Sequence, residues 1–165
     1  MTAVAKYNFT SSDGTTPQFA VGTEVEIKGC TFKYFVSGGA IALGALCTVA
    51  DDFVADEGTT TTSGARPTLC CIPQFEVAAA DEYFWAPIGP FGHDVPYGIV
   101  SGVKFQVKAA ALCAADVKLY TTATDGVVDD SATDLIAGLL LTETLVDAGL
   151  ADCIAVQRLV TNCQD

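Results

Sequence analysis

The sequence predicts an all-β fold: a small β-barrel or sandwich of about seven or eight short strands with an extended N-terminal arm. Short segments in which apolar and polar residues alternate recur along the chain, and this is the pattern of half-buried strands. Clusters of turn residues separate these segments at short intervals. Half of the 165 residues are hydrophobic and 17% are charged, so the chain can build one folded core.

The first 22 residues are polar and rich in threonine and serine, and they carry three separated aromatic residues, Tyr7, Phe9 and Phe19. A segment of this composition cannot cover a core. We therefore expect residues 1–22 to form an extended arm that becomes ordered on a partner. Residues 23–165 are then the single barrel domain, since a chain of this length is typical of one domain.

Alternation of apolar and charged residues begins at Thr23 and is interrupted at Gly29. Two strands are therefore predicted before Gly38. Residues 41–49 are apolar and rich in small side chains, which favours a third strand that is buried on both faces.

Two long loops are predicted. Residues 51–66 are a polar, low-complexity stretch that cannot bury an apolar face. Residues 86–98 contain so many prolines and glycines that neither a helix nor a central strand fits. Between the loops, residues 68–75 predict a strand, and Pro73 places it at a sheet edge or a bulge.

The most aromatic triplet of the chain is Tyr83, Phe84 and Trp85, and Phe91 follows within the second predicted loop. Aromatic side chains are enriched at the energetic centres of protein interfaces. We therefore identify these four residues, together with the three aromatic residues of the arm, as candidate contacts with a partner. The other interpretation is that Phe84 and Trp85 cap the barrel.

Towards the C-terminus, residues 103–109 alternate cleanly and predict a half-exposed strand. Asp125 and Gly126 lie between β-forming residues, a sequence that favours a tight hairpin turn in which Gly126 has a positive φ. A last strand is predicted over residues 154–159.

Residues 131–148 are ambiguous. Ser131 and Asp134 resemble a helix cap, and leucines follow at helical spacing. Gly138 opposes a helix, and the run over residues 135–141 equally suits a strand that is buried on both faces. The pattern leaves both interpretations open.

Four segments of the C-terminal third form one pattern of hairpins: Leu119-Tyr120, Asp125-Gly126, Ile136-Ala137-Gly138 and residues 154–159. This pattern resembles the small β-barrel decoration proteins, also called cement or head-stabilising proteins, of tailed-bacteriophage capsids. The resemblance covers about a third of the chain and implies that residues 135–141 are a strand. Residues 1–110 have no counterpart in it, and the cysteine content is higher than this family leads us to expect.

Seven cysteines are present, and none of them form a C-x-x-C pair. This odd number and spacing match neither a disulfide framework nor a usual zinc site, so we expect buried free thiols. The opening residues lack the basic and apolar regions of a secretory signal, which favours folding in a reducing cytosol. His93 is the sole histidine, and no context for a cysteine or histidine nucleophile accompanies it.

The formal net charge is −12, which makes nucleic acid and membrane surfaces poor partners. The acidic hairpin over residues 125–134 raises the alternative of a calcium site, but its spacing is not that of an EF-hand. Glycine-rich phosphate loops are absent from the sequence. We therefore expect no cofactor and no catalytic activity.

The resemblance implies a non-enzymatic virion protein, made in the host cytoplasm, that binds the outer surface of a phage head. It would stabilise contacts between major capsid subunits against internal DNA pressure, and a homotrimer is expected from the symmetry of such assemblies. One alternative is a binding module of a tail, fibre or adhesin that recognises carbohydrate through Tyr83 and Trp85. A β-fold hydrolase of another kind is the second alternative.

Overall fold

The computed structural model describes residues 7–62, 67–92, 104–131 and 134–162. Over these residues the chain is all-β and contains no helix, which confirms the predicted fold class. The eleven strands are more numerous than predicted. They are β1 (Glu24–Ile27), β2 (Cys30–Ser37), β3 (Cys47–Val49), β4 (Val54–Glu57), β5 (Thr68–Cys71), β6 (Tyr83–Pro87), β7 (Gln106–Ala109), β8 (Leu119–Thr121), β9 (Val128–Asp129), β10 (Asp134–Leu141) and β11 (Gly149–Asn162).

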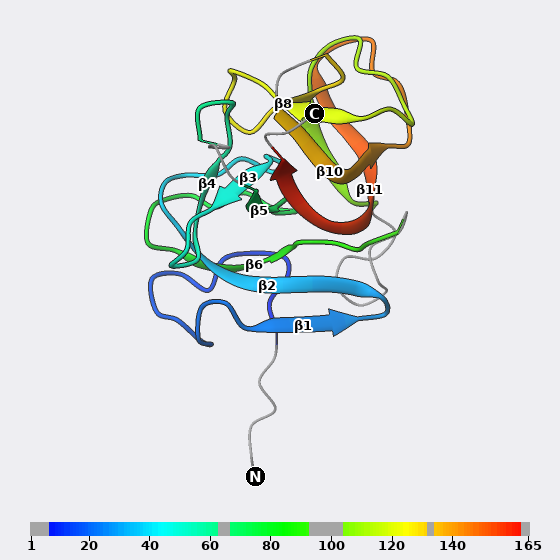
Figure 1. Cartoon of the computed structure of the whole chain (residues 1–165). Coiled ribbons are helices and arrows are strands. Elements are labelled where there is room, and N and C mark those ends of the chain that lie inside the picture. Colours follow the sequence, from blue (N-terminus) through cyan, green and yellow to red (C-terminus); the bar gives the residue numbers. More distant parts are fainter. Residues whose placement is uncertain (1–6, 63–66, 93–103, 132–133, 163–165) are drawn as a thin grey trace.

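Five C-terminal strands close into a small barrel. Around it the order is β7, β9, β8, β10 and β11, and β11 pairs again with β7 where Gly149 lies opposite Ala109. The far end of β11 stays paired with β10 on one edge and pairs with β5 on the other, so that Val160 lies between Ala137 and Leu69. The longest strand thus joins the barrel to the N-terminal strands (Figure 1).

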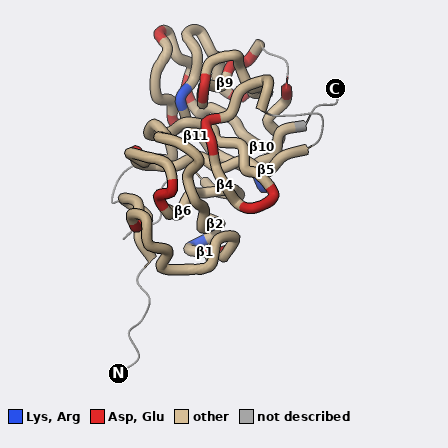
Figure 2. The backbone as a smooth tube through the Cα atoms, turned by 90° about the vertical axis from the view of Figure 1, so that its left-hand side faces the viewer, with Lys and Arg blue, Asp and Glu red and all other residues tan. Residues whose placement is uncertain are grey.

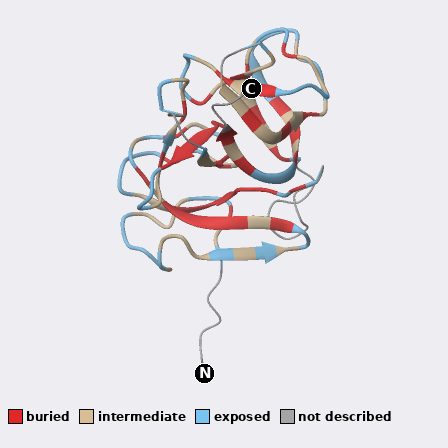
Figure 3. Cartoon of the chain, in the orientation of Figure 1, coloured by how far each residue is buried: buried red, intermediate tan, exposed pale blue. Residues whose placement is uncertain are grey.

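The N-terminal strands are arranged around β2 (Figure 1). One edge of β2 pairs with β6, and the other edge pairs with β1 at its beginning and with β4 at its end. Strand β3 lies between β4 and β5. Strand β2 is paired on both edges along most of its length, and most of its residues are buried (Figure 3).

Alternation along β2 and β6 divides their side chains between two cores. Phe35 and Phe84 point into a cluster that also contains Cys47 and Cys71. Their neighbours Tyr34, Phe32 and Trp85 belong to a second cluster, which continues into the C-terminal barrel. Both faces of these strands are therefore buried.

The ambiguous segment at 131–148 contains a strand and not a helix, as the resemblance implied. Strand β10 lies between β8 and β11, so its backbone groups are paired on both edges. The pairing with β11 shifts register between Ala137 and Leu139, and Gly138 has a φ of +88° at this bulge. Glycine adopts this backbone conformation without a steric penalty, which explains a glycine within a strand.

The hairpin at Asp125-Gly126 is confirmed, and Gly126 has a φ of +67°. The connection between β8 and β9 is longer than a two-residue turn, because pairing ends where Thr121 lies opposite Val128. The tight turn of the sequence prediction is wrong in this respect. Within this longer connection, the Gly126 carbonyl accepts a hydrogen bond from the Leu46 N–H, just before β3, at 2.9 Å.

Four predicted segments need correction. The loop at 51–66 contains β4, which is held between β2 and β3. The loop at 86–98 begins within β6, and its residues 93–98 lie outside the described residues. The strand at 41–49 is reduced to β3, and the strand at 68–75 ends before Pro73, as β5. The ends of these strands are set by pairing with strands that are distant in the sequence, and local composition carries no information about that pairing.

The N-terminal segment is also different from the prediction over its described part. Residues 7–22 lie against β2 and β6 rather than standing apart as an arm. The Asp13 N–H donates to the Tyr83 carbonyl at 2.7 Å, and the Tyr83 N–H donates to the Gly14 carbonyl at 2.9 Å. The Tyr34 hydroxyl donates to the Asp13 carboxylate at 2.7 Å. The boundary at Thr23 therefore does not separate an arm from a complete barrel.

Candidate interaction surface

The aromatic residues predicted as partner contacts mostly lie inside the protein. Phe84 is fully buried, Trp85 is 1% exposed, and Phe91 packs on Phe105 with ring centroids 4.5 Å apart. Their assignment to an exposed interface is therefore wrong for the chain as described. The reason is the pairing of β6 with β2, which turns successive aromatic side chains into the two cores.

The three aromatic residues of the N-terminal segment cover one of these cores. Phe9 is 8% exposed and lies 4.6 Å from the Phe32 ring, measured between centroids. Phe19 is half-buried against Tyr34 and Trp85. Tyr7 packs on the same group but keeps 39% of its surface exposed, and Tyr83 is half-buried beside Tyr34. Of the seven predicted residues, six lie in β6 or pack on Trp85, and Phe91 packs on Phe105 instead. Tyr7 is the most exposed of the seven.

The six cysteines within the described residues are buried and free, while Cys163 lies outside them. Burial raises the pKa of the Cys70 thiol to about 12. Burial, followed by the charges of Asp130 and Asp129, raises the pKa of Cys113 to about 11. These thiols are protonated near neutral pH, so they lack the thiolate character of a catalytic nucleophile.

We expect the buried thiols to resist alkylation in the native protein and to react once it is denatured. Intact-mass measurement after alkylation in denaturant without reductant should show seven labels, one for each cysteine. A chain that accepts only one label would contain three disulfides and would overturn the prediction of a reducing folding compartment.

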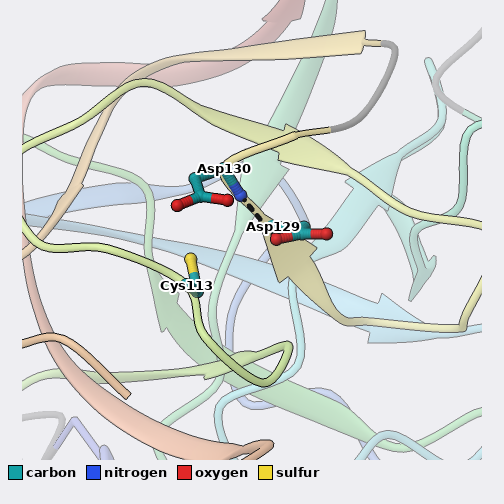
Figure 4. A group of neighbouring side chains, drawn as sticks. All are labelled: Cys113, Asp129 and Asp130. Atoms are coloured by element: carbon teal, nitrogen blue, oxygen red, sulfur yellow. Dashed lines mark hydrogen bonds between the residues drawn. The ribbon is translucent and has the colours of Figure 1, made fainter. Parts of the chain in front are cut away.

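Cys113, Asp129 and Asp130 form the one group of potential metal ligands found among the described residues (Figure 4). Their ligand atoms lie within 4.8 Å of one another. Each carboxylate already accepts a backbone hydrogen bond: Asp130 from Ala114 at 2.8 Å, and Asp129 from Asp130 at 2.8 Å. The alternative of a calcium site in the hairpin at 125–134 is therefore only partly matched, since Asp125 and Asp134 are not in the group. The Ala114–Asp130 hydrogen bond joins the 110–116 loop to this hairpin.

The described surface carries an apolar strip, defined by Leu43, Leu112, Val146 and Leu150. Leu150 lies opposite Lys108 in the β7–β11 pairing, and it lines a hollow of about 390 Å³ together with Leu43. Beyond this pairing, the Leu145 N–H donates to the Cys113 carbonyl at 3.0 Å. Leu112 and Val146 flank that hydrogen bond and are 74% and 75% exposed. The strip therefore lies beside the β7–β11 pairing and extends onto the two loops that follow β7 and precede β11.

The apolar strip was not apparent from the sequence. Leu112 stands in an alanine-rich run and Val146 in a segment with two open interpretations, so neither was distinguishable from a core residue. The sequence contained one weak indication that these residues are exposed: both lie beside small or acidic residues in segments without strict alternation. Only the closure of the barrel shows that these segments are loops.

A larger hollow of about 870 Å³ lies where β3 ends and where β4 and β5 begin. Phe53, Val49 and Leu69 line it together with the carboxylates of Asp51 and Asp56 and with threonine hydroxyls. This lining combines apolar, acidic and hydroxyl groups without one dominant chemistry.

No protein-family model, curated protein or solved structure matches this chain. Within the described part of the chain, no helix has the length and apolar character required to cross a bilayer. The apolar strip is therefore the feature from which a function can be argued.

Proposed function

We propose that this chain is a non-enzymatic structural protein of a bacteriophage virion. It would bind the outer surface of the head, link neighbouring major capsid subunits and stabilise the shell. The assignment to a capsid is based on the resemblance of the C-terminal hairpins to decoration proteins. We also propose that the protein is made in the host cytoplasm and acts as a homotrimer, since cyclic symmetry is common in such assemblies.

The observation that carries the proposal is the apolar strip on a closed barrel. Leu112 and Val146 are each about three-quarters exposed and flank one hydrogen bond, and apolar side chains that are exposed together mark interaction sites. The barrel beneath them is closed by β11 pairing with β7, so it presents the strip on a rigid support. A preorganised apolar surface of this kind suits docking on another protein.

The carbohydrate-binding alternative has lost its main support. It depended on exposed Tyr83 and Trp85, and Trp85 is buried in the core while Tyr83 is half-buried. Stacking on a sugar requires an accessible aromatic face.

Cryo-electron microscopy of native particles tests the proposal. We expect this chain on the outer surface of the head, in a copy number comparable to that of the major capsid protein. Density confined to a tail or fibre, at a few dozen copies or fewer, would contradict the capsid function and support the alternative.

A further inference from the structure

Leu112 combines two unfavourable properties. Its φ is +65°, in the left-handed region that side chains other than glycine seldom adopt. Its side chain is also 74% exposed, so packing within the chain does little to offset that strain. Neither local conformation nor the core explains a leucine at this position.

The other strained apolar residue is packed within the chain. Phe53 also has a φ of +65°, but its ring fills the space over Gly22 and lies 4.9 Å from the Lys33 ammonium. The remaining non-glycine residues with positive φ are polar and exposed: Lys28, Asp81 and Asp116. Among the described residues of this conformation, Leu112 alone is both apolar and largely exposed.

The loop that carries Leu112 is held by several hydrogen bonds. The Cys113 carbonyl accepts the Leu145 N–H at 3.0 Å, and the Ala114 N–H donates to Asp130 at 2.8 Å. The Asp116 N–H donates to the Leu141 carbonyl at 3.1 Å. Leu112 is therefore presented in a fixed position, which reduces the entropy lost when it binds.

The surroundings of Leu112 are acidic. The loops at 110–118 and 142–148 expose Asp116, Glu143 and Asp147, against one basic residue, Lys118. Acidic residues also predominate at the β9 end of the molecule (Figure 2), and the whole chain carries a net charge of −12. Electrostatic complementarity therefore favours a partner surface that is basic around an apolar centre.

We propose that Leu112, supported by Val146, is the anchor of the docking surface, and that it enters an apolar recess bordered by lysine or arginine on a major capsid subunit. This inference rests on the proposed function, which it deepens by assigning the contact and the chemistry of the partner. Leucine at 112 would then be retained for binding, at the expense of stability in the free protein.

Leu112→Gly provides the test, because a stabilising role and a docking role predict opposite results. Glycine removes the strain at positive φ, so we expect the melting temperature to rise by about 2–4 °C. Affinity for undecorated heads, measured by sedimentation, should fall at least tenfold. Lys28→Gly is the matched control: it removes strain at a φ of +51° in the β1–β2 turn and should leave affinity unchanged.

The outcomes separate the inference from the proposed function. If the wild-type protein does not bind undecorated heads, the proposed function fails. If the wild type binds and Leu112→Gly binds equally well, the proposed function stands and the anchor is refuted. A lower melting temperature for Leu112→Gly would also refute the inference, because leucine would then stabilise the loop itself. Wild-type affinity that does not fall as sodium chloride is raised would refute the basic border of the recess.

Discussion

Replacement of Gly126 by valine should lower the free energy of unfolding by about 3 kcal/mol. Two effects combine at this position. Gly126 has a φ of +67°, which a β-branched residue tolerates poorly, and an added Cβ would lie 2.6 Å from the Ala45 Cβ. The substitution would also disturb two hydrogen bonds, from Leu46 to the Gly126 carbonyl and from Gly126 to the Gly58 carbonyl. Urea denaturation of the two proteins measures the difference.

Gly29→Val is the matched control for this experiment. Gly29 has a similar φ of +81°, but no atom lies within 4 Å of an added Cβ. We expect it to destabilise the protein by about 1–2 kcal/mol, the strain of the left-handed backbone alone. Equal losses in the two variants would mean that the β8–β9 connection does not pack on Ala45.

Phe9→Ala should lower the free energy of unfolding by about 3 kcal/mol, within the range for deletion of a buried aromatic side chain. Phe9 packs against Phe32 and Trp85 in the larger core cluster, so its loss would leave a cavity and expose part of Trp85. Urea denaturation monitored by the fluorescence of Trp85, the sole tryptophan, reports both stability and this environment.

The conservative variant Phe9→Leu keeps most of the apolar volume and should lose less than about 1.5 kcal/mol. If Phe9→Ala instead unfolds like the wild type, the segment before Thr23 does not pack on β6 in solution. That result would support a separate N-terminal arm.

Alternation in the sequence predicted where the strands lie better than it predicted which residues pack against them. In β2, alternation correctly separates Phe35 from Tyr34. It could not show that both sides are buried, because the cover over Tyr34 comes from Phe19 and Asp13, which precede the strand by more than ten residues. A polar, threonine-rich segment predicts an arm, and its few aromatic residues are sufficient to hold it against a neighbouring sheet.

Residues 135–141 show a different limit of prediction from the sequence. Leucines spaced for one face of a helix also suit a strand that is covered on both faces, and local propensity does not separate the two. Pairing of β10 with both β8 and β11 decides for the strand, since each supplies hydrogen bonds along one edge. The bulge at Gly138 then accommodates the one residue that had opposed a helix.

By itself, the sequence determined the all-β class, the positive φ of Gly126 and the acidic character of the chain. These properties depend on local spacing, on the stereochemistry of glycine and on composition, all of which can be read from adjacent residues. The tertiary structure alone decided that Trp85 is buried while Leu112 and Val146 are exposed. Exposure depends on which distant segments pair, here β6 with β2 and β11 with β7, and an apolar residue has the same identity in a core as on a docking surface.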